Sequence, residues 1–338
     1  MRIENSKFSQ VVLFLSATVL LGLPGGLAVD FKPPTEADRL RAIGPTARLP
    51  ATLRKALEPG ADFEPVSIPR RGDWLAEHPE SGQSFEDFAR SKPNRPDKNR
   101  SKIYVQPLGE FPMLKTSLVE RLMQYASAYF AMDVRELPVL DLSDKDINTR
   151  INTFTGKRQI LTSDILAILK KTLPKEGFCV VAITMEDLFP EPSWNFVFGQ
   201  ASLRERVGVY SFARYDPVFY GEKRGENYEK ILLWRSCKVL VHEVGHIFGL
   251  THCIYFKCAL NGSNHLKESD TRPMHLCPVC LRKLQHSVRF DVVKRYVNLF
   301  HFYQKVGFDD EARWVAGRLE QIIGADAAKE TVEQTNQK

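Results

Sequence analysis

One stretch of the chain limits the possible folds more than any other. Residues 242–252 read His-Glu-Val-Gly-His-Ile-Phe-Gly-Leu-Thr-His, which matches the pattern H-E-x-x-H-x-x-G-x-x-H. On an α-helix, His242 and His246 lie one turn apart on the same face, so both imidazoles can bind one cation at about 2.0–2.1 Å. Gly249 can adopt the left-handed conformation that ends a helix, after which the chain can return His252 as a third ligand.

This motif predicts a catalytic zinc site on a buried helix. Three protein ligands leave a fourth position open, which is typical of catalytic rather than structural zinc. Glu243 stands beside the ligands, where it can reach a water on the metal, and we assign it as the general base. Leu240, Val244 and Ile247 form an apolar face, so we expect a buried helix over residues 236–250. Polar side chains on such a helix need a partner, and a metal ion in a cleft supplies one.

Four of the six cysteines follow the histidine motif closely. Cys253 comes directly after the third histidine, Cys258 follows five residues later, and Cys277 and Cys280 form a C-x-x-C pair. This spacing is typical of a structural zinc held by four thiolates, so the sequence predicts a second zinc ion in the chain. Two disulfides are the alternative, and a secretory N-terminus would permit them.

The remaining pattern interleaves strands with helices, which indicates an α+β, α/β-like layered domain. Residues 178–184 are continuously apolar and predict a strand buried on both faces, whereas residues 194–199 and 208–212 alternate like half-buried strands. We expect Cys179 and Cys237 to be inert core thiols. Further elements are expected as a strand at 103–105 and as helices at 116–131, at 163–169 with Ser163 as N-cap, at 288–304 and at 312–322.

The N-terminus raises a separate question. Residues 8–29 carry no charge, follow a short basic start and include a 13-residue apolar run. This pattern predicts a secretory signal, with a single-span anchor or a buried or processed segment as alternatives. We therefore expect the secretory pathway as location, with the cytoplasm or nucleus as the alternative. Residues 29–100 are polar and read as an N-terminal extension that ends in a linker at 91–98.

The motifs taken together resemble one family. The metal motif runs into the cysteines, with Asn261-Gly262-Ser263-Asn264-His265 and Arg272-Pro273 between them, and this order resembles the archaemetzincins, a family of zinc metallopeptidases. Residues 73–75, 78–80, 194–201 and 211–215 also resemble the animal members. The resemblance covers about residues 70–300.

The resemblance implies a compact zincin-like domain, with a twisted mixed sheet and a cleft beside the metal helix. It implies that Glu243 is the general base and that the activity is aminopeptidase-like or of limited specificity. The implied ligands are His242, His246 and His252 for a catalytic zinc and Cys253, Cys258, Cys277 and Cys280 for a structural zinc. One position departs from the family: Leu260 stands where the family has the methionine that corresponds to the metzincin Met-turn. Leucine and methionine have similar volumes, so such an exchange usually costs less than about 1.5 kcal/mol.

We therefore divide the chain into a signal-like or anchor segment (1–28), an extension and linker (29–100), a zincin-like metallopeptidase domain (101–305) and a helical tail (306–338). The expected reaction is peptide-bond hydrolysis, with a peptide or protein as partner and the chain as a monomer. Membrane contact is expected only if the N-terminus is an uncleaved anchor. A zinc-containing binding protein with little turnover is the alternative, and no motif separates the two.

Other features bear on partners and on the reaction. The net charge is 47 − 41 = +6 and is spread along the sequence, and the cysteine region lacks interleaved basic and aromatic residues, so we expect no nucleic acid partner. The strand near residues 194–199 is expected to hold a peptide by β-augmentation. Tyr210, Tyr215 and Tyr255 are candidates for a proton-donating role, and the sequence does not choose among them.

Overall fold

The computed structural model describes residues 12–17, 31–78, 80–109, 111, 116–143 and 146–335. Within these residues nine strands form one sheet in the order β3-β2-β6-β9-β8-β7-β5-β4, and β1 pairs with β8 beside this path. The strands are β1 (Val12–Ala17), β2 (Lys102–Leu108), β3 (Asp133–Glu136), β4 (Thr149–Ile151), β5 (Arg158–Leu161), β6 (Gly177–Thr184), β7 (Asp187–Phe189), β8 (Phe196–Ser202) and β9 (Val207–Ser211).

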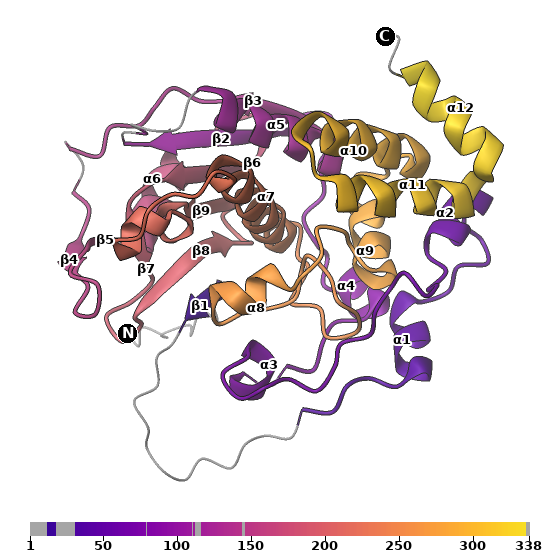
Figure 1. Cartoon of the computed structure of the whole chain (residues 1–338), viewed down its shortest axis with the longest axis horizontal. Coiled ribbons are helices and arrows are strands. Elements are labelled where there is room, and N and C mark those ends of the chain that lie inside the picture. Colours follow the sequence, from indigo (N-terminus) through magenta and orange to yellow (C-terminus); the bar gives the residue numbers. More distant parts are fainter. Residues whose placement is uncertain are drawn as a thin grey trace, which may run out of the picture.

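Helices cover both faces of this sheet, and further helices lie beyond its right-hand side in the view of Figure 1. The expected layered fold of a mixed sheet with helices is confirmed. The α-helices are α1 (Glu36–Ile43), α2 (Ala51–Ala56), α3 (Trp74–Glu77), α4 (Phe85–Arg90), α5 (Thr116–Phe130), α6 (Thr162–Thr172), α7 (Tyr228–Ile247), α8 (Leu266–Asp270), α9 (Pro278–Val288), α10 (Val292–Val306), α11 (Asp309–Ile323) and α12 (Ala325–Thr335). Two 3₁₀ turns, η1 (Ala213–Tyr215) and η2 (Pro217–Tyr220), follow β9.

β6 lies inside the sheet, where it pairs in parallel with β2 and β9. Its residues alternate between two apolar cores. Val181 and Ile183 join the core that contains α5 and α7, whereas Val180 and Ala182 join the core that contains α6. Burial on both faces explains why this strand is apolar throughout, and the predicted buried strand is confirmed.

β8 and β9 are the strands expected at residues 194–199 and 208–212, but they are buried rather than half-buried. The reason is that α7 covers one face of both strands and α6 covers the other. The short strand expected at 103–105 is the start of β2, which extends to Leu108.

α7 is the helix expected over residues 236–250, and it begins earlier, at Tyr228. Every residue from Ser236 to Ile247 is buried, as the apolar pattern predicts. Gly249 has a φ of +91°, and its N–H donates to the carbonyl of His246 at 2.8 Å. This left-handed residue ends the helix and turns the chain back, which is the geometry predicted for the third histidine.

α6 begins at Thr162, so the assignment of Ser163 as its N-cap is wrong. Leu161 occupies the N-cap position and makes no side-chain cap. The Thr162 hydroxyl instead donates to the side chain of Gln200 on β8. The first residue of this helix is therefore bonded to the sheet, and the N-cap residue before it makes no side-chain bond.

Only residues 12–17 of the predicted signal or anchor segment are described, and the rest of residues 1–28 lies outside the described part of the chain. Residues 12–17 form β1, which runs antiparallel to β8 with Val12 opposite Ser202 and Ala17 opposite Phe196. Among the described helices, none is both long enough and apolar enough to cross a membrane. The location of the protein stays a prediction.

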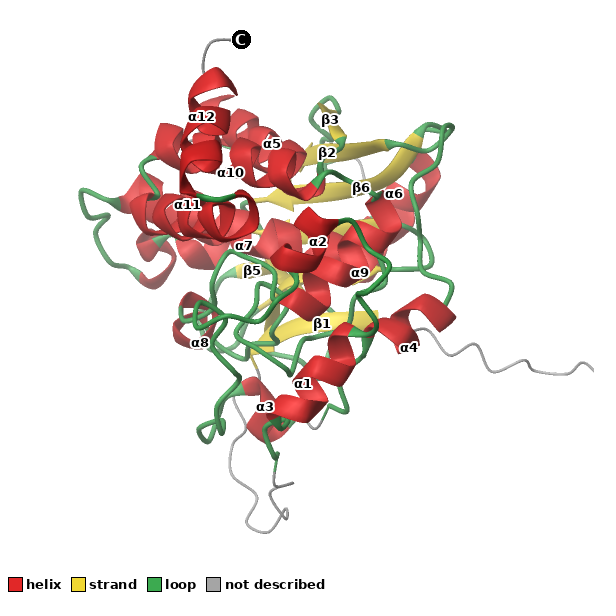
Figure 2. Ribbon diagram, turned by 90° about the vertical axis from the view of Figure 1, so that its right-hand side faces the viewer, coloured by secondary structure: helices red, strands yellow, loops and turns green. Residues whose placement is uncertain are grey.

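The extension before residue 100 packs against the rest of the chain. Figure 2 shows α1, α3 and α4 gathered at one end of the molecule, with α11 and α12 at the opposite end. Within the segment that reads as a linker, the Asn94 side-chain amide donates to the carbonyls of Leu203 and Ile247 at 2.7 and 2.8 Å. These bonds tie residues 91–98 to the end of α7, beside the histidine motif.

Candidate active site

Three imidazoles from α7 and the turn after it converge inside the protein. The Nε2 atoms of His242 and His246 are 2.9 Å apart, and His252 completes a set whose ligand atoms all lie within 4.8 Å of one another. All three residues are buried. Burial lowers the pKa of His242 well below its ordinary value and that of His246 to about 3, so both rings are neutral, as metal ligands must be.

A hydrogen bond at Nδ1 fixes the orientation of each ring. Nδ1 of His242 and Nδ1 of His246 donate to main-chain carbonyls at 3.0 and 2.7 Å, and Nδ1 of His252 donates to the Glu80 carboxylate at 2.7 Å. The Nε2 lone pairs are left for a common partner, and Nε2 of His252 is buried with no partner among the described residues. A cation would satisfy all three atoms, so this donor set fits a zinc ion.

Glu243 lies buried between α7 and β8. Neither of its carboxylate oxygens has a hydrogen-bond partner in the described part of the chain. Burial raises the pKa of Glu243 well above its ordinary value. β8 approaches closely here, because a Cβ atom on Gly199 would lie 2.7 Å from Oε1 of Glu243. A buried carboxylate that no protein group satisfies is suited to an external partner such as a water.

The buried guanidinium of Arg272 lies beside His242. It donates to the carbonyl of Asn261 and, at 2.7 Å, to the hydroxyl of Ser269, and its Nη1 lies 3.5 Å from Nδ1 of His242. Its positive charge adds to burial in lowering the pKa of His242. In the sequence, Arg272 stands out only as part of the family resemblance, because no spacing rule connects it to the histidines.

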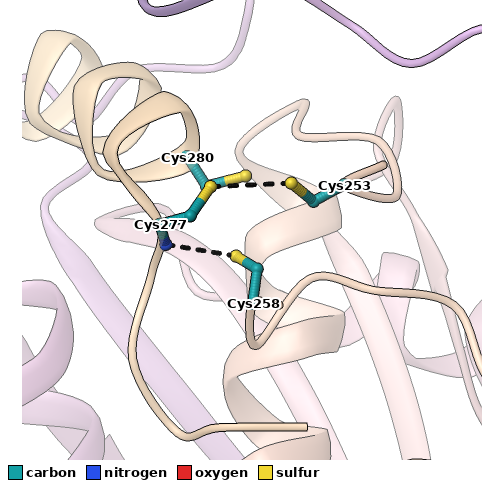
Figure 3. Close-up of side chains that lie close together, drawn as sticks. All are labelled: Cys253, Cys258, Cys277 and Cys280. Carbon is teal, nitrogen blue, oxygen red and sulfur yellow. Dashed lines mark hydrogen bonds between the residues drawn. The ribbon is translucent and has the colours of Figure 1, made fainter. Parts of the chain in front are cut away.

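Figure 3 shows the second cluster, in which Cys253 and Cys258 from the turn after α7 face Cys277 and Cys280 at the start of α9. The four Sγ atoms lie within 4.8 Å of one another, and those of Cys253 and Cys277 are 3.5 Å apart. Two thiolates on a tetrahedral zinc, with Zn–S bonds of about 2.3 Å, would be about 3.8 Å apart.

All six cysteines of the chain are free in the structure, so the disulfide alternative is not present in it. Burial opposes ionisation of Cys253 and Cys277. Hydrogen bonds from its neighbours nevertheless lower the pKa of Cys253 well below its ordinary value, whereas burial raises the pKa of Cys277. Four buried thiols this close together fit the donor set of a zinc ion, which binds cysteines as thiolates.

Leu260, at the position where the resemblance expects methionine, is buried beneath α7. Its Cδ1 atom lies 2.9 Å from where a Cβ atom on Gly245 would be, so it packs directly against α7.

Two of the candidate tyrosines are affected by Glu243. It contributes to the raised pKa of both Tyr210 and Tyr215, after the larger effect of their burial. Tyr255 lies near the cysteine cluster instead, where Cys253 raises its pKa in addition to burial. The structure thus places two of the three candidate tyrosines near Glu243.

A third group of possible ligands, formed by Asp73, His265 and Glu268, is explained by local structure. The two oxygens of Glu268 accept the main-chain N–H groups of Trp74 and Asn264 at 2.8 and 2.7 Å. His265 in turn accepts the N–H of Glu268 and caps α8. These residues join α8 to α3, and we assign no metal to them.

Several known proteins are similar to this chain. A sequence profile described as Peptidase family M54 matches residues 160–286, a range that includes all the candidate zinc ligands. Archaemetzincin-2 of Homo sapiens is 42% identical over 289 residues, which cover 77% of this chain and 79% of that protein. Archaemetzincin-1 of Homo sapiens is 32% identical over 78% of this chain and 58% of its own length. The crystal structure of archaemetzincin from Methanopyrus kandleri has 29% identity and a TM-score of 0.44, and covers 58% of this chain and 99% of that chain.

Proposed function

This chain belongs to the archaemetzincin family of zinc metallopeptidases, and from that premise we propose that it hydrolyses peptide bonds at a zinc ion held by His242, His246 and His252. One observation carries the proposal: three buried imidazoles converge beside a buried carboxylate that has no partner within the described chain. Peptides or proteins are the expected substrates. The alternative, a zinc-containing binding protein, has the same site and differs in turnover.

The chemistry divides between the metal and Glu243. When bound, zinc supplies a Lewis acid that polarises a carbonyl and acidifies a water. Glu243 accepts the proton of the attacking water and later donates it to the leaving amine. Its oxygens break no protein hydrogen bond to do so. The burial that raises the pKa of Glu243 favours its taking a proton from the water.

We also propose a structural zinc at Cys253, Cys258, Cys277 and Cys280, which makes two zinc ions per chain. The four thiols join the turn after α7 to the first turn of α9. Because Cys253 follows the third histidine directly, a metal at this cluster would hold that histidine in place from its C-terminal side. The closed set of four thiolates leaves no position for substrate, so the role is structural.

One edge of β8 pairs with β9, and the other edge is where a peptide would bind by β-augmentation. β1 pairs with this edge, and Leu15 lies opposite Gly199, the residue beside the general base. A substrate held by β-augmentation on the same edge would need the same N–H and C=O groups, so it would have to displace β1. Under this proposal, a chain that lacks residues 1–28 has a lower KM for peptides than the full chain.

Zinc analysis and turnover, measured on the same samples of the wild type and Glu243→Gln, test the function. We expect about two zinc ions per chain in both proteins and cleavage of a peptide library by the wild type alone. Two zinc ions with no cleavage in either protein would favour the binding protein. An active Glu243→Gln variant would refute the assignment of the general base. Comparing free and N-acetylated forms of a cleaved peptide tests the narrower proposal of aminopeptidase-like activity, which requires the free amine.

A further inference from the structure

The third histidine is held differently from the other two. His242 and His246 donate to main-chain carbonyls within residues 250–259, whereas His252 donates to a carboxylate that lies 172 residues earlier in the sequence. The bond from Nδ1 of His252 to Oε1 of Glu80 is 2.7 Å long, with the His252 side chain 1% exposed and that of Glu80 22% exposed. A charged acceptor in such a partly buried position makes a stronger hydrogen bond than a carbonyl.

Glu80 is itself fixed by Trp74. The indole Nε1 of Trp74 donates to the same carboxylate oxygen at 2.8 Å, and its ring meets that of His252 edge to face with centroids 4.9 Å apart. Trp74 has little freedom, because its main-chain N–H donates to Glu268 and a Cβ atom on Gly262 would lie 2.3 Å from its ring. The carboxylate is therefore presented to His252 from a rigid support.

Gln83 holds the turn that carries His252. Its side-chain amide donates to the carbonyl of Gly249 at 3.2 Å and accepts the N–H of Thr251 at 3.3 Å. Trp74, Glu80 and Gln83 thus contact the turn after α7 at both its backbone and its histidine ring. The side chains that make these contacts, those of Trp74, Glu80 and Gln83, lie outside the histidine and cysteine motifs.

We propose that Glu80 is a positioning residue for the catalytic metal and that Trp74, Glu80 and Gln83 form an outer layer of the histidine site. The proposal rests on the proposed function, since it assumes a metal at the three histidines. His252 lies beyond the end of α7, so no helix fixes its ring. A carboxylate at Nδ1 holds the tautomer that leaves Nε2 free, aims Nε2 at the other ligands and makes it more basic. Loss of such a partner typically lowers metal affinity 10–100-fold.

The test uses the full chain loaded with zinc, as wild type, Glu80→Gln, Glu80→Ala and Glu77→Gln. Glutamine keeps an acceptor oxygen without the charge, and alanine removes both. Glu77 is the matched control, because it is exposed, lies three residues from Glu80 and uses its carboxylate to accept the N–H of Gly72. Zinc release to a competing chelator gives the affinity of each site, and the visible spectrum of the cobalt-substituted protein reports the ligand geometry at the histidines.

We expect one of the two zinc ions to bind 10–100-fold more weakly in Glu80→Gln, with a larger loss in Glu80→Ala and no change in Glu77→Gln. The cobalt spectrum should shift in both Glu80 variants, whereas the second zinc ion should bind as in the wild type. Wild-type zinc affinity and an unshifted spectrum in both Glu80 variants would overturn the proposal. Loss of both metals together with a lowered Tm would also overturn it, since Glu80 would then support the whole fold. A wild type that binds no metal at the histidines would instead refute the proposed function.

Discussion

Replacing Gly199 by alanine tests whether the close approach of β8 to the general base is required for activity. The added Cβ atom would lie 2.7 Å from Oε1 of Glu243, 2.9 Å from its Cδ and 2.9 Å from Cβ of Tyr210. Carbon contacts are most favourable at about 3.5–4.0 Å, so the methyl group is about 0.6–1.1 Å too close to both carbon atoms. Tyr210 pairs directly with Gly199 across β8 and β9, and its Cβ cannot yield unless the sheet moves. Relief of both contacts therefore requires the Glu243 side chain to shift and β8 to move slightly against β9.

A displacement of about 1 Å in a reacting group costs on the order of 10²-fold in rate, and overpacking a core costs about 1–3 kcal/mol. We therefore expect Gly199→Ala to lower kcat/KM about 100-fold while it keeps both zinc ions. The assay is the initial rate on a fluorogenic peptide that the wild type cleaves, with zinc analysis and urea unfolding of the same protein.

Gly208→Ala is the matched control on the neighbouring strand. A Cβ atom there would have its nearest contacts at 3.6 Å, which is an ordinary van der Waals distance. This variant should keep wild-type activity and be as stable as the wild type, or more stable by about 0.4–1 kcal/mol. The reasoning is refuted if Gly199→Ala retains wild-type kcat/KM, or if it loses activity only because zinc is lost with it.

Three further predictions concern buried charges and the cysteine cluster. Burial lowers the pKa of Lys238 from 10.5 to about 6, so the unfolded chain binds more protons than the folded one between these values, and stability falls as the pH drops through this range. Lys238→Met should flatten that dependence in urea unfolding at several pH values, and an unchanged slope would contradict the assignment. Cys280→Ser should lose one zinc ion and weaken the other, because the cluster begins at the residue after His252; metal analysis that shows full occupancy of both sites would argue against this coupling. Arg214→Met leaves Asp187 buried without its cation and should cost about 3–5 kcal/mol in urea unfolding, whereas a loss below 1 kcal/mol would mean that water reaches the carboxylate.

The sequence predicts the part of the site whose residues are related by spacing. Metal ligands must recur at helical or hairpin intervals, so the histidines and cysteines can be recognised, and the structure brings each set together. The family that these motifs suggest is confirmed by the similarity to archaemetzincins. Glu80 and Arg272 could not be assigned roles, because their contacts to His252 and His242 arise only when distant segments fold together. The segment around Glu80 stands out in the sequence solely through the family resemblance.

In the fold, too, the sequence predicts features that local patterns determine and misses those that depend on packing between distant segments. The apolar run of β6 predicts a buried strand because burial on both faces requires apolar residues throughout. The pattern of β8 and β9 indicates one polar face, yet α6 and α7 cover both faces, and no local pattern reveals which helices will pack there. The bond to β8 from Thr162, the first residue of α6, is likewise a contact that no local pattern reveals.

The bond between Glu80 and His252 also has a consequence during synthesis of the chain. The two residues are 172 positions apart, so at about 5–20 residues per second the carboxylate leaves the ribosome roughly 9–34 s before the histidine. The cysteine cluster is complete only after Cys280, near the end of the 338-residue chain. A nascent chain therefore contains Glu80 long before His252 has been added to it. It cannot assemble the histidine site until most of its length has been made.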